Sequence, residues 1–217
     1  DKTKDYNTSF KRALNLGVYS ADLGYINTFN KNTVVVSYLV AVKDLADGIN
    51  VGQFLDFNTL KRLATNSTNL DSLKQLSVSS FNTMDKYLRE QKRSNVSTAI
   101  VAGAWVEGIY ITSCVIEQTN DTELINRLGE QKDIVNILMI VLNNYSKADN
   151  NFKALISKIE AVKKLVQGES MDYSHITRKA MQTLAYFLFN IFTLETKYDE
   201  NGKLKVNDTT VSFDELG

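Results

Sequence analysis

The chain contains no proline among its 217 residues, although an average usage of about 5% would give about eleven. Proline interrupts helices because its ring clashes with the preceding turn and because it lacks a backbone N–H donor. A chain of this length without proline can therefore form long, uninterrupted helices. Whether it does so depends on the spacing of its apolar residues.

Cysteine and histidine each occur once, at Cys114 and His175. A single cysteine cannot form an intramolecular disulfide, so the hydrophobic core must supply the stability of the fold. One cysteine and one histidine cannot supply the four nitrogen or sulfur ligands of a structural zinc site. No nucleophile motif surrounds His175. We therefore expect no resident metal ion and no cofactor.

Charge is balanced, with 25 Lys and Arg residues against 25 Asp and Glu residues. Proteins that bind nucleic acids usually carry a basic surface that neutralises phosphates. Here no basic run is longer than two residues, as at Lys92-Arg93, and we expect no nucleic-acid partner. The chain also lacks a glycine-rich phosphate loop and a nucleophile elbow. No enzyme class is indicated by its motifs.

Apolar residues recur at steps of three and four along most of the chain, which is the period of an α-helix. The expected helices cover residues 9–30, 32–46, 56–65, 70–93, 95–118, a segment capped by 120–123 that runs to 146, 149–167 and 173–196. Short connections favour antiparallel neighbours. The predicted fold is an all-α, antiparallel helical bundle of about eight helices.

The ends of the chain differ from its middle. Residues 1–9 are polar and are interpreted as a tether, while residues 10–196 are expected to form a single helical domain. An internal duplication into halves 10–93 and 95–196 is an alternative organisation. In the tail, 197–217, Asn201-Gly202 lies between two short extended segments, which predicts a hairpin. A disordered tail is the alternative.

The run from Ala99 to Ile116 carries one charged residue, Glu107. Its length would allow it to cross a bilayer. However, a carboxylate at the bilayer centre costs a few kcal/mol. A central helix that is surrounded by other helices explains the same run, and we favour this interpretation.

Two isolated acids, Asp22 and Glu107, lie on the helices that are expected to be most buried. Each is followed three residues later by a tyrosine on the same helix face. Tyr19 and Trp105 precede them at comparable positions in a short internal sequence match. The candidate ligand-binding residues are Asp22, Tyr25, Tyr19, Trp105, Glu107 and Tyr110.

An ionised carboxylate in a hydrocarbon environment is costly unless it is paired, hydrogen-bonded or protonated. Asp22 and Glu107 are therefore expected to contact tyrosine hydroxyls, a cation, helix-end amides or each other. Three interpretations follow: a polar staple that fixes helix register, a ligand or ion site between the helices, or a paired-carboxylate acid–base site. Glycosidase chemistry would need carboxyls on opposite sides of an open cleft, and the lack of flanking loops argues against it.

The segments Asn15–Tyr25 and Gly103–Tyr110 resemble a family of lipoproteins of Bacteroidota, and the order of long helices is similar from about Phe10 to Leu194. This resemblance implies a removed signal peptide, a lipidated cysteine just upstream of Asp1 and a location in the cell envelope. The family has no established activity, so the resemblance implies no catalytic role.

Together these features predict a non-enzymatic, all-helical protein of the cell envelope. It would bind an unknown protein partner or small-molecule ligand between its central helices and contact the membrane only through an N-terminal lipid anchor. One alternative is an enzyme that uses Asp22 and Glu107 as paired carboxylates. Another is a purely structural spacer, in which both acids only fix the packing.

Overall fold

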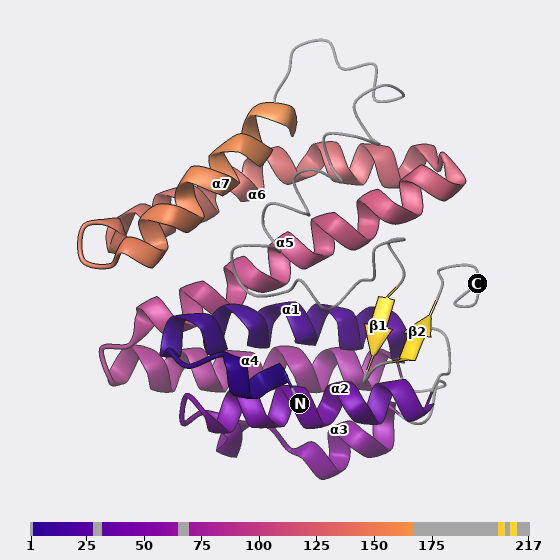
Figure 1. Ribbon diagram of the computed structural model, residues 1–217, viewed down its shortest axis with the longest axis vertical. Coiled ribbons are helices and arrows are strands. Elements are labelled where there is room, and N and C mark those ends of the chain that lie inside the picture. The colour runs from indigo at the N-terminus through magenta and orange to yellow at the C-terminus, as the bar shows by residue number, and fades with distance from the viewer. Residues whose placement is uncertain (1, 28–31, 65–69, 167–203, 207–208, 212–217) are drawn as a thin grey trace. The chain divides into compact units, whose positions relative to one another are not determined.

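The computed structural model describes residues 2–27, 32–64, 70–166, 204–206 and 209–211. These residues form seven α-helices, two short 3-10 helices and two three-residue strands (Figure 1). The predicted all-α fold is confirmed. The eighth predicted helix, 173–196, and His175 lie outside the described residues.

The described helices belong to two compact units that divide between Glu107 and Gly108. The boundary falls inside α5, Ser94–Thr119, rather than near residue 94, where the two predicted halves would meet. The first unit contains η1 Lys2–Asp5, α1 Ser9–Asn27, α2 Asn32–Asp47, η2 Gly52–Phe54, α3 Phe57–Ala64, α4 Leu70–Glu90 and the first part of α5. The second contains the rest of α5, α6 Thr122–Ser146 and α7 Asn150–Val166.

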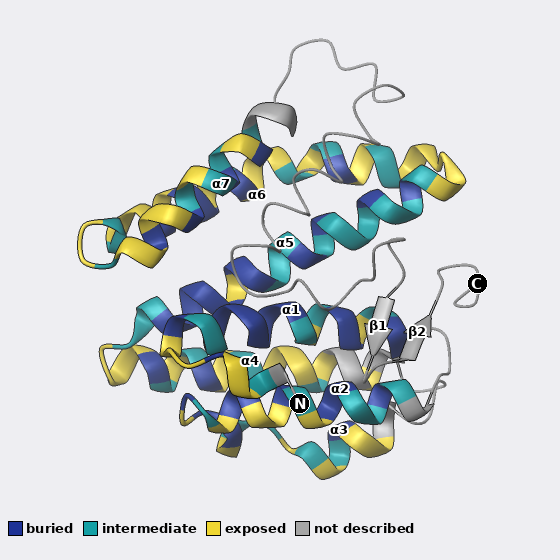
Figure 2. Cartoon of the chain, in the orientation of Figure 1, coloured by how far each residue is buried: buried dark blue, intermediate teal, exposed yellow. Residues whose placement is uncertain are grey.

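In the first unit, α1 packs along α2, α2 packs against α3, and α3 packs against α4. Helix α1 carries two apolar stripes and is buried over most of its circumference (Figure 2). Its buried side chains include Phe10 and Leu14 from one stripe and Leu16, Leu23 and Ile26 from the other. A helix covered on several sides can bring its polar residues into the protein interior.

The first residues of the chain are packed against this unit and do not form the predicted polar tether. Residues 2–5 form the 3-10 helix η1, which contacts α2, and Tyr6 is only 1% exposed. Thr8 accepts a hydrogen bond from the backbone N–H of Lys11 and so caps α1. The prediction was wrong because it weighed the polar character of residues 1–9 above the single aromatic ring of Tyr6.

The loop after α2 reverses the chain in a few residues. Helix α2 ends at Asp47, directly before Gly48. The left-handed backbone conformation is adopted by Asn50, with φ of 58°, and the N–H of Val51 bonds to the carbonyl of Ala46. A Cβ atom on Gly48 would lie 2.9 Å from Cδ of Arg12. Glycine therefore leaves room for the Arg12 side chain.

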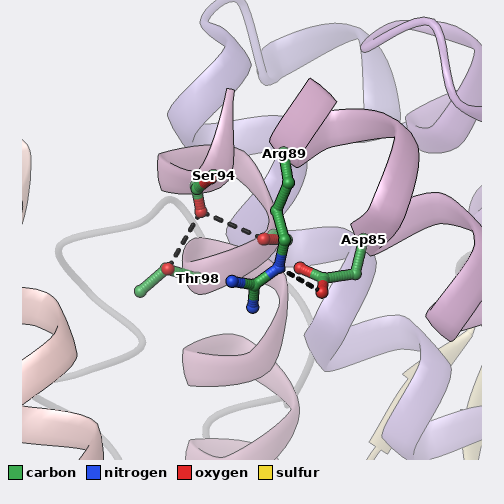
Figure 3. A network of polar contacts seen from close by, with 5 residues as sticks. Asp85, Arg89, Ser94 and Thr98 are labelled. Carbon is green, nitrogen blue, oxygen red and sulfur yellow. Dashed lines mark hydrogen bonds and ion pairs between the residues drawn. The ribbon is translucent and has the colours of Figure 1, made fainter. Parts of the chain in front are cut away.

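A tight corner joins α4 to α5. Lys92 has a positive φ of 56°, and the N–H of Arg93 bonds to the carbonyl of Leu88, which satisfies the end of α4. Figure 3 shows Arg89 bonding to Asp85 one turn earlier and Thr98 donating to the Ser94 carbonyl at the start of α5. The exposed ion pair contributes little to stability, so the backbone bonds are the main determinants of this corner.

In the second unit, α6 and α7 are joined by a short connection and pack against each other as an antiparallel pair. Asp121 caps α6, as the sequence predicts, and its Oδ1 accepts from the N–H groups of Glu123 at 2.8 Å and Leu124 at 3.1 Å. Between the helices, the ring of Phe152 lies 5.3 Å from that of Tyr145. Phe152 is 1% exposed and is a central residue of this core.

One side of α6 remains apolar and accessible to solvent. Ile134, Ile137 and Ile140 are 47%, 63% and 67% exposed, and Val141 is exposed as well. Ile134, Ile137 and Val141 are spaced by three and four residues and therefore lie on one helix face. This face is the most continuous exposed aliphatic surface among the described residues.

Helix α5 is the one described helix that is long and apolar enough to cross a membrane by length and composition alone. The central helix of a soluble core meets the same criteria. In its first half, Val96, Ala99, Ile100 and Ala102 are buried within the first unit. This burial agrees with the central-helix interpretation for that half.

The tail contains a small hairpin. Strands β1 Leu204–Val206 and β2 Thr209–Val211 pair antiparallel, with Leu204 opposite Val211. The predicted turn at Asn201-Gly202 lies outside the described residues.

Candidate functional site: a buried acid–phenol cluster

Asp22 and Glu107 are both buried within the first unit. Asp22, on α1, is 4% exposed, and Glu107, on α5, is 0% exposed. Burial removes the water that would otherwise solvate a carboxylate, so neighbouring groups determine its energy. The expectation that both acids are sequestered from solvent is confirmed.

Helices α1 and α5 approach each other closely through glycine. A Cβ atom on Gly17 would lie 2.0 Å from the carbonyl oxygen of Ile100, and one on Gly103 would lie 1.9 Å from the carbonyl oxygen of Leu14. Only a residue without a side chain fits at either position. Gly17 and Gly103 are the glycines at which the two helices cross. Asp22 follows Gly17, and Glu107 follows Gly103, each by about one helical turn. The crossing therefore brings the acid-bearing segments of the two helices together.

Tyr38, on α2, lies within electrostatic reach of both acids. Burial raises the pKa of the Tyr38 phenol, and the negative charges of Asp22 and Glu107 raise it further. The phenol therefore remains protonated through the neutral range and can donate a hydrogen bond. The Tyr38 ring packs against Tyr19, with ring centroids 5.5 Å apart.

Tyr6 completes the group from the N-terminal segment. Burial raises the pKa of Tyr6, and its side-chain hydrogen bond to Tyr19 and the charge of Asp22 add to this shift. We call Asp22, Glu107, Tyr6, Tyr19 and Tyr38 the acid–phenol cluster. It combines two carboxyl groups with three phenols from the N-terminal segment, α1, α2 and α5.

A buried amide lies on the same face of α1. Asn15 precedes Tyr19 by four residues and Asp22 by seven, so the three side chains project from one face. Asn15 is 0% exposed, and its Nδ2 donates to the carbonyl of Lys11 at 2.9 Å. Its Oδ1 is a buried acceptor that receives no hydrogen bond from the described residues. Such an acceptor costs about 1–3 kcal/mol unless a donor satisfies it.

Three other predicted site residues share the partial burial of Tyr19. Tyr25, Trp105 and Tyr110 are each only partly buried. Tyr110 follows Glu107 by one turn of α5 but belongs to the second unit. Of the predicted site, Asp22, Tyr19 and Glu107 all lie near Tyr38.

Sequence reasoning missed Tyr6 and Tyr38. Tyr38 belongs to the apolar stripe of α2, where its spacing fits an ordinary core residue. Its relation to the acids depends on how three helices pack. Tyr6 could have been recognised as the one aromatic residue before the helix cap at Thr8. A hydrophobic residue just before a cap often packs back onto the helix.

The donor set consists of oxygen atoms from carboxyl, phenol and amide groups. Among the described residues, no group of three or more His, Cys, Asp or Glu side chains is gathered to hold a metal ion. Oxygen acceptors of this kind are suited to a hydrogen-bond donor or a hard cation rather than to a soft metal.

Comparison with known proteins gives no match. No family model fits the chain, and no curated protein or solved structure is significantly similar to it. The resemblance to envelope lipoproteins therefore stays a prediction that rests on the two sequence segments.

Proposed function

We propose that this chain is a non-enzymatic, all-helical protein of the cell envelope that binds a small ligand or partner group at the acid–phenol cluster. The ligand would present a cationic or hydrogen-bond-donating group. The single observation that carries this proposal is the burial of two carboxyls on helices that cross closely at Gly17 and Gly103. A positive group placed among them would offset the cost of burying two acids.

The buried Asn15 oxygen supports the same ligand chemistry. It lies on the α1 face that carries Tyr19 and Asp22, and it is an acceptor to which no described residue donates a hydrogen bond. A ligand that donates a hydrogen bond could satisfy it. The site thus favours cations and donors and disfavours anions.

An acid–base enzyme is a weaker interpretation of the same residues. Catalytic carboxyls must reach the substrate and exchange protons with it. Asp22 and Glu107 are 4% and 0% exposed, so a substrate as large as a sugar would need a large rearrangement to reach them. A small cation or ammonium group needs less space.

The test compares the wild-type chain with a variant in which Asp22→Asn and Glu107→Gln are combined. Isothermal titration calorimetry with calcium chloride, magnesium chloride and methylammonium chloride would measure binding by each protein. We expect at least one cation to bind the wild type and to bind the double variant at least tenfold more weakly. Equal binding by both proteins, or no binding by the wild type, would contradict the proposal.

The close crossing of α1 and α5 favours a second candidate, a polar staple. Here the acids would fix the relative position of tightly packed helices and bind nothing. Conservative replacement would then lower the free energy of unfolding, by about 1–3 kcal/mol for each buried group left unsatisfied. Calorimetry would detect no cation bound to the wild type. The titration therefore separates the two candidates.

The envelope location is a separate part of the proposal and rests on the resemblance of the two segments. It predicts that the coding sequence upstream of Asp1 encodes a signal peptide that ends in a lipid-accepting cysteine. Fractionation of cells that express the full gene should then place the protein with the membranes. A soluble protein translated from a start codon close to Asp1 would contradict this part alone.

A further inference from the structure

We infer that Arg12 and Arg93 form a binding site for the phosphate group of a small soluble molecule, beside the loop that follows α2. Both arginines belong to the first unit, where Arg12 lies in α1 and Arg93 lies at the corner between α4 and α5. The site shares no side chain with the acid–phenol cluster and takes a ligand of the opposite charge. The inference therefore goes beyond the proposed function and does not depend on it.

Two guanidinium groups bond to consecutive residues of one loop. Arg12 Nη1 donates to the carbonyl of Gly48 at 2.9 Å, and Arg93 Nη2 donates to the carbonyl of Ile49 at 2.9 Å. The Cα atoms of consecutive residues are about 3.8 Å apart, so the two cations are held at adjacent peptide groups. Like charges at short range repel each other. An anion that contacts both guanidinium groups would offset this repulsion.

Neither guanidinium is neutralised by a carboxylate of the described residues. The exposed residues Arg89 and Arg127 each form an ion pair with an acid one turn earlier on the same helix, and Figure 3 shows the pair at Arg89. Arg12 and Arg93 are half-buried, and within the described part of the chain they bond only to backbone carbonyls. Partial burial makes an unneutralised charge more costly than it is in water. These two cations therefore have the most to gain from a bound anion.

Acids are present at the end of α2, but their contacts lie elsewhere. Asp47 is the last residue of α2 and forms an ion pair with Lys43 one turn earlier. The Asp44 carboxylate lies 3.5 Å from the hydroxyl of Thr3. Within the described residues, neither acid forms an ion pair with Arg12. An anion from outside the protein can therefore supply the missing counter-charge.

Both guanidinium groups keep N–H donors for such an anion. A guanidinium has five N–H donors, of which Arg12 uses two and Arg93 uses one within the described residues. Both side chains are partly accessible to solvent, so a ligand can reach them. A phosphate group carries about −1.5 to −2 charges at neutral pH and three strong acceptor oxygens. It matches two cations with spare donors better than a carboxylate, which carries a single charge.

Gly48 shows how closely the Arg12 side chain fits this loop. A Cβ atom on Gly48 would lie 2.9 Å from Cδ and 3.0 Å from Nε of Arg12. The backbone of Gly48 does not adopt the left-handed conformation that favours glycine. The contact with Arg12 is therefore the reason that glycine suits this position. Alanine at residue 48 would displace the Arg12 side chain and leave its charge intact.

The test is isothermal titration calorimetry of the full chain at low ionic strength with sodium phosphate, glycerol 3-phosphate and sodium acetate. Arg12→Met and Arg93→Met each remove one guanidinium group, and Gly48→Ala displaces that of Arg12. Arg89→Met is the matched control, because Arg89 lies one turn before Arg93 and pairs with Asp85. Circular dichroism would establish that each variant is folded.

We expect the wild type to bind both phosphate compounds and to bind acetate more weakly. Arg12→Met and Arg93→Met should each bind phosphate at least about tenfold more weakly, as loss of a charged hydrogen bond implies. Gly48→Ala should fold, because only a flexible side chain has to move, and should bind about three- to tenfold more weakly. Arg89→Met should stay within about twofold of the wild type, because an exposed ion pair contributes little.

A wild-type protein that binds neither phosphate compound would overturn the inference. So would a folded Gly48→Ala protein that binds phosphate as tightly as the wild type, or an Arg89→Met protein that loses as much affinity as Arg93→Met. Sedimentation with vesicles that contain phosphatidic acid identifies the source of the phosphate group, and binding to these vesicles alone would contradict a soluble ligand. Because the ligands are anions, failure of this test leaves cation binding at the acid–phenol cluster untouched.

Discussion

Adding one methyl group at Gly17 tests the crossing of α1 and α5, which positions both acids. The new Cβ would lie 2.0 Å from the Ile100 carbonyl oxygen and 2.6 Å from the Ala104 nitrogen. Carbon and carbonyl oxygen atoms in close contact are normally about 3.3–3.6 Å apart. The neighbouring atoms belong to the backbone and cannot move aside as a side chain could. The two helices must therefore separate by roughly the difference between the normal and the observed distance, which is more than about 1 Å.

The energy follows from two opposing terms. Alanine is a better helix former than glycine by about 0.8–1.0 kcal/mol. Overpacking typically costs about 1–3 kcal/mol and occasionally more, and a backbone-to-backbone clash belongs at the upper end. We expect Gly17→Ala to lower the free energy of unfolding by a net amount of about 1–3 kcal/mol.

Each crossing glycine has a matched control on its own helix. Nothing lies within 4 Å of a Cβ atom built on Gly24 of α1 or on Gly108 of α5. Gly24→Ala and Gly108→Ala should therefore raise stability by about 0.5–1 kcal/mol. Urea denaturation followed by circular dichroism and by the fluorescence of the one tryptophan, Trp105, would measure all four variants, Gly103→Ala included.

The result that refutes this reasoning is a Gly17→Ala or Gly103→Ala protein as stable as its control. Such a protein would show that the two helices do not approach closely at these residues. The common position of Asp22 and Glu107 near Tyr38 would then lose its structural basis.

Three further predictions concern other parts of the chain. Asp121→Ala removes the cap of α6 and should lower stability by about 0.5–2 kcal/mol in urea denaturation, whereas Asp121→Ser should restore most of it. Phe152→Ala should cost about 3–5 kcal/mol by the same measurement, and a loss below 1 kcal/mol, about the cost of an ordinary surface change, would argue against the α6–α7 core. Burial raises the folded-state pKa of Tyr6 and of Tyr38 above the ordinary phenol value of about 10, so their contribution to stability is fully present below that pH. It should be lost as the pH rises above about 10, by about 1.4 kcal/mol per pH unit for each phenol. Absorbance at 295 nm during an alkaline titration should show these two phenols ionising only on unfolding, and Tyr38→Phe should remove one of them; early ionisation of every tyrosine would contradict their burial.

The sequence predicted the helices well because each carries its own periodic signal. The observed bounds Ser9–Asn27, Asn32–Asp47 and Leu70–Glu90 lie within about three residues of those expected. The cap at Asp121 was also recognisable, since capping depends on neighbours along the chain. Local interactions therefore explain most of the secondary structure.

The candidate site was only partly predictable. Asp22 and Glu107 stand out because an isolated acid in an apolar helix is unusual. Tyr38 could not be assigned to the same site, because its electrostatic interaction with both acids depends on the packing of α1, α2 and α5. Tyr6 was assigned to a tether because the residues around it are polar, although its own ring is buried.

The most direct test of the acid–phenol cluster is a double-mutant cycle on the free energy of unfolding, with Asp22→Asn, Glu107→Gln and the combined variant measured by urea denaturation. Two acids that share Tyr38 should be coupled, so we expect the double variant to depart from the sum of the single variants by more than about 0.5 kcal/mol. Effects that add within about 0.3 kcal/mol would show that the two carboxyls act independently, and they would contradict the existence of a common site.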